Sequence, residues 1–275
     1  MPEDVYTHGH HESVLRSHTW RTAANSAAYL LPSLRAGLDL LDVGCGPGTI
    51  TRDFAPLVAP GRVVGLDRST DVLQQAAAAG SAGPVQSVDM AQPVRIEWRV
   101  GDVYALPFPD GSFDVVHAHQ VLQHLSDPVR ALVEMRRVLR PGGVLAARDS
   151  DYGAFTWTPA DSRLDRWREL YSAVARRNGG EPDAGRFLRQ WALAAGLPDV
   201  EVGRSTWTYA DPESTAWWGN LWADRCEHSA LGEQAIAYGL STRGELQAIA
   251  AAWRAWAAKH DARFIVPHGE LLVRL

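Results

Sequence analysis

The chain has 275 residues, of which 46% are hydrophobic, and its formal net charge at pH 7 is −5. This length accommodates one large α/β core with an insertion better than two full domains, and the negative charge argues against unassisted binding to nucleic acid. Two cysteines, Cys45 and Cys226, are too few for a disulfide framework or a cysteine metal cluster. Because no apolar run is typical of a signal peptide or a membrane span, we expect a soluble cytoplasmic protein with no membrane partner.

The residues before the first predicted strand are interpreted as a lid. Residues 12–31 carry apolar or small side chains at helical spacing and end before Pro32, which predicts one helix. The histidine-rich run at residues 6–11 suggests zinc at first sight, but no C-x-x-C or H-E-x-x-H motif accompanies it. We therefore expect no metal site.

Strand-like and helical segments then alternate, which predicts a parallel, doubly wound sheet. Residues 80–93 are rich in glycine, serine and proline and are expected to form a loop. The expected strands are 38–43, 62–67, 94–100, 113–119 and 143–149, and the expected helices are 49–58, 70–79 and 128–139.

The pattern changes after Asp149, where helical segments dominate. A strand over residues 200–209 interrupts them, and a last strand at 263–275 is expected to have an irregular middle around Pro267-His268-Gly269. The expected helices of this half are 160–178, 183–195 and a long helical segment that ends near residue 259.

The run LLDVGCGPGT at residues 40–49 places Gly44, Gly46 and Gly48 after a short apolar strand and before a helix. Glycine permits backbone angles closed to other residues and lets the main chain approach a ligand closely. The next apolar strand ends in Asp67, whose carboxylate can accept hydrogen bonds from both hydroxyls of a ribose. This series of strand, glycine loop, helix, strand and acid indicates a nucleotide-cofactor site.

The details of this loop bear on the identity of the cofactor. The nicotinamide fingerprint is G-x-G-x-x-G, but Thr49 stands where the last glycine should fall, which disfavours a dehydrogenase. No G-x-x-x-x-G-K-[ST] string occurs, so a P-loop is excluded. Asp42, directly before the loop, suits a ligand with an ammonium or sulfonium end better than a pyrophosphate.

Four separated motifs resemble those of the class I S-adenosylmethionine-dependent methyltransferases, particularly the small-molecule group that includes ubiquinone and menaquinone biosynthesis enzymes. They cover roughly residues 38–150 and are LLDVGCGPGT at 40–49, VVGLDRS at 63–69, Gly101-Asp102-Val103, and FDVVHAHQVLQHL at 113–125 followed by LRPGGVLAARD at 139–149. The resemblance implies an α/β fold with a seven-stranded, Rossmann-like sheet whose last strand is antiparallel. It also implies S-adenosylmethionine as cofactor and S-adenosylhomocysteine as product.

The resemblance further divides this single domain, residues 1–275, into parts. These are lid helices at 1–37, a cofactor-binding core at 38–150, a helical extension at 151–195 and a helical cap at 213–260, inserted between the last two strands. Acceptor specificity is expected to lie in the cap.

Individual residues take expected roles from the resemblance. The glycine loop would hold the methionine end of the cofactor, Asp67 its ribose, and Asp102 with the amide of Val103 its adenine. His119 and Gln120 end the fourth predicted strand, where ligands of open α/β sheets usually bind. The full expected cofactor set is Asp42, Gly44, Cys45, Gly46, Gly48, Thr49, Asp67, Arg68, Asp102, Val103, His119, Gln120 and Arg21, with Arg16 as the alternative to Arg21 for the methionine carboxylate.

Methyl transfer needs few catalytic side chains, because alignment of the reactants supplies much of the rate. An acceptor gains from a nearby base that takes its proton, and histidine or tyrosine is the usual group. The candidates are His119, His124, Tyr6 and His11.

Nine of the eleven tryptophans follow residue 150. Large rings can simply fill contacts between helices and sheet, but their clustering favours a pocket for an aromatic or heteroaromatic small molecule. A narrower hypothesis is similarity to natural-product enzymes of secondary metabolism that methylate indole rings.

Two alternative functions remain. One is a binding protein that keeps the nucleoside pocket but catalyses no reaction, and the other is a dehydrogenase. The acceptor, the methylated atom and the oligomeric state stay open, with a homodimer as one candidate.

Overall fold

The computed structural model describes residues 5–7, 12–80, 95–197 and 199–275. His11 lies outside the described residues, and so does the predicted loop at 80–93 except for its first residue. One eight-stranded mixed sheet has the order β3-β2-β1-β4-β5-β8-β6, and β7 also pairs with β8. The strands are β1 (Leu40–Val43), β2 (Val63–Asp67), β3 (Ile96–Val100), β4 (Phe113–His119), β5 (Leu139–Ser150), β6 (Thr156–Thr158), β7 (Val200–Tyr209) and β8 (Arg263–Arg274).

The predicted α/β, Rossmann-like fold is confirmed. Strands β1 to β5 pair in parallel, and β8 is antiparallel to both β5 and β7. The helices are α1 (Glu12–Thr19), α2 (Ala23–Ser26), α3 (Thr49–Val58), α4 (Thr70–Gly80), α5 (Pro128–Arg137), α6 (Ser162–Arg177), α7 (Leu188–Ala194), α8 (Pro212–His228), α9 (Ala230–Ala237) and α10 (Arg243–Ala257).

The predicted strand number is one too low. The additional strand, β6, pairs with residues 263–265 of β8, while β5 pairs with residues 268–274 of the same strand. A strand of three residues is too short to show a periodicity in the sequence. It forms because β8 extends beyond its pairing with β5 and leaves residues 263–265 to pair with another strand.

The expected irregular middle of the last strand is also wrong, because β8 pairs continuously from Phe264 to Val273 with β7. Pro267 has no amide to donate, but its carbonyl accepts a hydrogen bond from the amide of Asp151 at 3.1 Å. At Gly269 a Cβ atom would lie 1.9 Å from the carbonyl oxygen of Gly185. This glycine therefore permits a close approach of two backbones rather than a break in the strand.

The single N-terminal helix expected over residues 12–31 is instead two helices, α1 and α2. The break comes at Thr22, whose side chain accepts a hydrogen bond from the amide of Asn25, while the Asn25 side chain accepts one from the amide of Thr22. This reciprocal capping box begins a new helix. The chain between the helices, Trp20 and Arg21, thereby turns toward the sheet.

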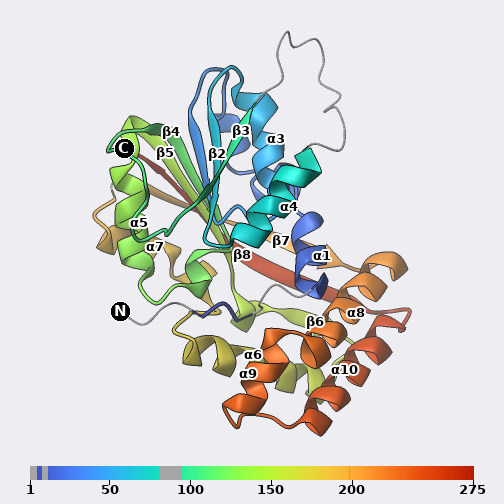
Figure 1. Ribbon diagram of the computed structural model, residues 1–275. Helices are drawn as coiled ribbons and strands as arrows, with labels where there is room; N and C mark the ends of the chain where they lie inside the picture. Colours follow the sequence, from blue (N-terminus) through green and yellow to red (C-terminus); the bar gives the residue numbers. More distant parts are fainter. Residues whose placement is uncertain (1–4, 8–11, 81–94, 198) are drawn as a thin grey trace.

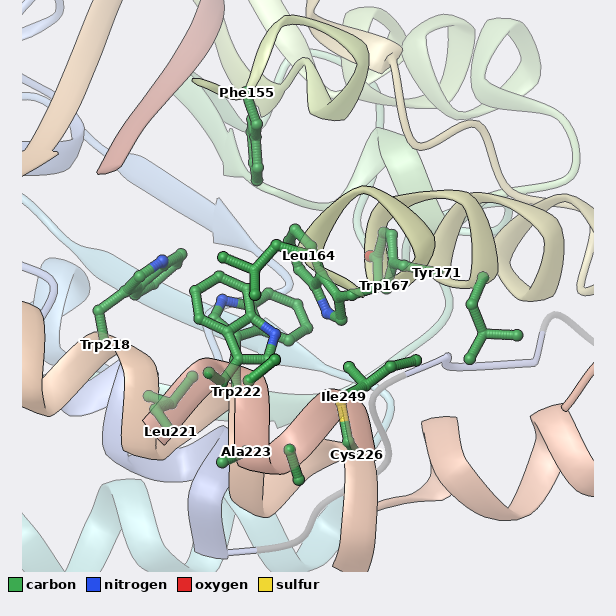
Figure 2. Packing of buried hydrophobic residues seen from close by; sticks show 14 of the residues in the cluster. Phe155, Leu164, Trp167, Tyr171, Trp218, Leu221, Trp222, Ala223, Cys226 and Ile249 are labelled. Atoms are coloured by element: carbon green, nitrogen blue, oxygen red, sulfur yellow. The ribbon is translucent and has the colours of Figure 1, made fainter. Parts of the chain in front are cut away.

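Helices α6, α8, α9 and α10 gather at one end of the sheet, and α1 lies beside α8 (Figure 1). The core of this helical region is built from large rings, with Trp167, Trp222, Trp253 and Trp256 at most 1% exposed. Figure 2 shows several of these rings packed between the facing helices. In the described part of the chain, no helix combines the length and apolar character that a membrane crossing requires.

Candidate functional site

A cavity of about 930 Å³ lies at the carboxyl ends of β1, β2 and β4, between the sheet, the N-terminal segment and α8. This is the edge of a parallel sheet at which ligands of α/β proteins bind. The volume is within the range of pockets that hold small molecules, roughly 300–1,000 Å³. Fourteen predicted site residues line it: Tyr6, Arg21, Asp42, Gly44, Cys45, Gly46, Thr49, Asp67, Arg68, Asp102, Val103, His119, Gln120 and His124.

The glycine loop contributes backbone to the cavity wall. Gly44 and Gly46 have φ values of 64° and 55°, which non-glycine residues adopt at a cost. A Cβ atom added at Gly46 would meet a single neighbour within 4 Å, the Nδ1 atom of His18 at 3.8 Å, so the backbone here faces open space. The amide of Gly46 donates a hydrogen bond to Asp67 at 3.0 Å, which joins the loop to the end of β2.

Gly48 does not line the cavity. A Cβ atom here would lie 2.2 Å from a ring carbon of Trp98, and one at Gly65 would lie 2.5 Å from the same ring. Gly48 also begins α3 with φ 74° and no side-chain cap. Its lack of a side chain therefore makes room for Trp98 beneath the loop, a packing role that spacing along the chain does not reveal.

Asp42 lines the cavity, but both of its carboxylate oxygens are engaged within the protein. Oδ1 lies 2.7 Å from Nδ1 of His117, and Oδ2 accepts a hydrogen bond from the Thr51 hydroxyl at 2.5 Å. The residue is 2% exposed. Asp42 thus ties β1 to β4 and α3 and orients the loop that follows it.

The N-terminal segment covers the cavity from the side opposite the sheet. Arg21 donates to Oε1 of Gln120 at 2.5 Å, and the Gln120 amide nitrogen donates to the Ser150 hydroxyl at 2.8 Å. Gln120 has φ 53°, an uncommon value for a residue with a side chain, which aims it into this network. Arg16, the alternative to Arg21, instead pairs with Asp224 at 2.7 Å on the surface.

The candidate proton acceptors lie on two sides of the cavity. His119 is 6% exposed, and neither ring nitrogen has a hydrogen-bond partner among the described residues. Burial lowers the pKa of His119 well below its usual range, and the charges of Arg21 and Arg148 act in the same direction. The ring is therefore neutral at pH 7, and the same effects make it a weaker base than an exposed imidazole. Tyr6 and His124 contact each other edge to face, with ring centroids 4.8 Å apart.

Aromatic rings form the wall of the cavity toward the cap. Tyr209 and Trp218 stack with centroids 4.4 Å apart and an interplanar angle of 13°. The ring centroid of Trp20 lies 5.2 Å from that of Trp207 and 5.7 Å from that of Trp217. Seven of the nine tryptophans after residue 150 lie at these places. Trp207, Trp217, Trp218 and Trp222 line the cavity, and Trp167, Trp253 and Trp256 fill the cap core without reaching it.

Sequence reasoning missed Arg225, which lines the cavity although its residue is 4% exposed. It donates to the Ser17 hydroxyl at 2.5 Å, and its guanidinium lies 4.8 Å from the ring of Trp222. The signal was present in the sequence, because Trp218, Trp222 and Arg225 follow at helical spacing on one face of α8. Within the described residues, no group of three His, Cys, Asp or Glu side chains could hold a metal ion.

Comparisons with known proteins agree with this geometry. A family model described as a methyltransferase domain matches residues 41–147. The chain is 34% identical over 275 residues to an uncharacterized methyltransferase of Schizosaccharomyces pombe, covering 98% of this chain and 96% of that protein. It is 34% identical over 202 residues to a demethylmenaquinone methyltransferase of a Parafrankia species, covering 69% and 76%. The YcgJ protein of Bacillus subtilis shares the fold, with a TM-score of 0.54, 18% identity and coverage of 90% and 96%.

Proposed function

The chain belongs to the class I S-adenosylmethionine-dependent methyltransferases, and on that premise we propose that it methylates a small aromatic or heteroaromatic acceptor held against the cap. The observation that supports this acceptor class is the aromatic wall of the cavity, made by Trp20, Trp207, Tyr209 and Trp218. Flat rings of this kind bind other flat rings through offset or edge-to-face contacts. The narrower hypothesis remains an indole ring of a tryptophan-derived natural product.

The residues of the cavity fit S-adenosylmethionine. The backbone at Gly46 is open to the cavity, where the amino-acid end of the cofactor needs a close approach. Asp67 ends β2 with a carboxylate suited to ribose hydroxyls, and exposed Asp102 with the amide of Val103 offers an acceptor and a donor for adenine. Arg21 would pair with the methionine carboxylate, because a guanidinium matches a carboxylate in geometry and charge.

When bound, S-adenosylmethionine supplies a methyl group activated by a sulfonium. The residues of this chain position the acceptor, exclude water and accept a proton. The aromatic wall and the N-terminal segment shield the cavity from solvent, which strengthens electrostatic contacts inside it. Among the candidates, His119 is favoured by geometry, because it lines the cavity and neither of its ring nitrogens has a hydrogen-bond partner among the described residues. Its lowered pKa makes it a weak base, so it suits an acceptor whose own proton is lost easily.

Turnover with a panel of acceptors tests the proposal. Purified protein would be incubated with labelled S-adenosylmethionine and with indoles, tryptophan-containing cyclic dipeptides, phenols and aliphatic amines, and S-adenosylhomocysteine formation would be followed. We expect turnover with members of the aromatic groups. Methylation confined to aliphatic amines would overturn the aromatic assignment.

Cofactor binding is tested separately by calorimetry with S-adenosylhomocysteine. We expect Asp67→Asn to weaken binding by about tenfold or more, since it removes a charge-assisted hydrogen bond of roughly 1.5–3 kcal/mol. Asp71→Asn, an exposed residue in the first turn of α4, is the matched control and should leave the affinity unchanged. Equal affinities of the two variants would contradict the role of Asp67.

A further inference from the structure

We propose that the acceptor carries a carboxylate and that Arg225 binds it. This inference rests on the proposed function and adds the charge of the acceptor to its aromatic character. It follows from a guanidinium in the cavity wall that no carboxylate of the described residues pairs with. Arg254, elsewhere on the cap, is by contrast paired with Glu227 at 2.6 Å.

The guanidinium of Arg225 is buried and contacts neutral groups among the described residues. Its residue is 4% exposed, its hydrogen-bond partner is the neutral Ser17 hydroxyl, and its Nε atom has no partner among the described residues. Burying a charge without a paired opposite charge costs several kcal/mol. Such a group persists at a site where a ligand supplies the missing charge.

A second guanidinium increases the excess of positive charge. Arg21 also lines the cavity without a carboxylate partner in the described structure, and burial together with the charge of Arg225 lowers the pKa of Arg21 to about 10. The carboxylates that line the cavity are Asp42, Asp67 and Asp102, all on the β1, β2 and β3 side. Asp42 is already engaged by His117 and Thr51.

The charge of the cofactor does not resolve this excess. S-adenosylmethionine has one carboxylate, which Arg21 can pair with, but it also brings an ammonium and a sulfonium. Arg225 then still lacks an anion. A guanidinium presents a planar pair of donors that matches a carboxylate, which is why we assign this group to the acceptor.

The remaining groups of the wall agree with an anion and disfavour a cation. Aromatic rings can bind an alkylammonium through cation–π contacts, but here Arg225 already lies 4.8 Å from the ring of Trp222 and Arg21 lies 5.8 Å from the ring of Trp207. The indole Nε1 of Trp218 and the hydroxyl of Tyr209 also have no hydrogen-bond partner among the described residues. Both can donate to a carboxylate.

Three ligands of nearly equal shape test the inference by binding rather than turnover. Indole-3-acetate, indole-3-acetamide and tryptamine would be titrated by calorimetry into wild-type protein saturated with S-adenosylhomocysteine. We expect the carboxylate to bind on the order of 10- to 100-fold more tightly than the amide, and the amine most weakly. Equal binding, a preference for the amide or the amine, or binding of none of the three would overturn the inference.

Variants separate recognition from folding. Arg225→Gln should reduce the preference for the carboxylate over the amide to about twofold or less, while Arg225→Lys should keep part of it. Arg243→Gln, on the exposed start of α10, is the matched control and should retain the full preference. Because the buried charge of Arg225 has no carboxylate partner in the part of the chain that the structure describes, Arg225→Gln should not lower the Tm of the ligand-free protein, as loss of a structural ion pair would.

The two levels of the proposal fail in different ways. If S-adenosylhomocysteine binds and the carboxylate is not preferred, or if Arg225→Gln keeps the preference, the charge assignment is wrong and the methyltransferase function stands. If S-adenosylhomocysteine does not bind to the wild-type protein, the cofactor site itself is wrong.

Discussion

Gly46 and Gly48 have similar backbone angles but different surroundings. Both have positive φ, yet one faces the cavity and the other lies against the ring of Trp98. A glycine motif therefore combines binding and packing requirements within three residues. The two requirements can be separated by experiment, because they affect different measured quantities.

We expect Gly48→Ala to lower the free energy of unfolding by about 2 kcal/mol or more, from overpacking against Trp98 together with unfavourable φ. Gly46→Ala should cost about 1 kcal/mol from φ alone and should weaken binding of S-adenosylhomocysteine. Urea unfolding and calorimetry measure the two effects. Equal losses of stability in both variants would contradict this division.

The carboxyl group of Asp149, at the end of β5, is expected to make the free energy of unfolding depend on pH. It is 0% exposed, Oδ1 accepts a hydrogen bond from the amide of Gln123, and burial raises its pKa to about 7. The folded state therefore holds a proton that the unfolded state releases near pH 4. The stability that Asp149 contributes is fully present below about pH 4 and is lost as the pH rises to about 7.

Comparison with Asp149→Asn isolates this titration from that of other groups. The free energy of unfolding of the wild type, relative to that of the variant, should fall by a few kcal/mol between about pH 4 and pH 7 and then become constant. Chemical unfolding at a series of pH values measures the difference. Two parallel curves would show that the carboxyl group titrates normally.

Helix α1 and helix α8 pack against each other beside the cavity, and the contact has two components. The Arg16–Asp224 pair lies at the surface, with side chains 46% and 29% exposed, whereas Ser17 contacts the buried Arg225. Exposed ion pairs contribute about 0–1 kcal/mol, so the buried Ser17 and the places of Trp20 and Arg21 in the cavity wall are expected to matter more.

Deletion of residues 1–20 should weaken binding of S-adenosylhomocysteine by about tenfold or more, equivalent to 1.4 kcal/mol, because it removes the wall that includes His18 and Trp20. Asp224→Asn removes the surface pair alone and should change the affinity less than about twofold. Calorimetry on both proteins tests the difference. If the point variant reproduces the effect of the deletion, the ion pair, rather than the covering segment, controls the site.

The cap is at once a second hydrophobic core and one wall of the site. Trp253 is 0% exposed inside the cap, whereas Trp217 is partly buried and lines the cavity. The same residue type thus stabilises the fold at one position and faces the ligand space at another (Figure 2 shows the packed interior).

Trp253→Ala should lower the free energy of unfolding by about 3–5 kcal/mol, the usual cost of removing a large buried ring. Trp217→Ala should cost about 1 kcal/mol or less and should reduce the affinity for indole-3-acetate instead. Denaturant unfolding and ligand titration check both. A large loss of stability in Trp217→Ala would mean that this ring belongs to the core.

The alternation of strands and helices predicted the sheet, and four motifs within residues 38–150 predicted the family and the cofactor, because a tight turn and a strand-end acid depend on local residue types. Local signals also placed α3 at the residues predicted. They could not show that Pro267 and Gly269 lie inside a continuous strand, since the close approach of Gly185 comes from a distant segment.

Tertiary packing decided what the aromatic and charged residues do. Helical spacing puts Trp218, Trp222 and Arg225 on one face of α8, but whether that face meets core or cavity depends on where α8 sits relative to β7 and α1. Burial of a charge is a property of the assembled structure, because its cost and its missing partner arise from side chains far apart in the chain. Hence the cofactor could be predicted from the sequence, and the carboxylate now assigned to the acceptor could not.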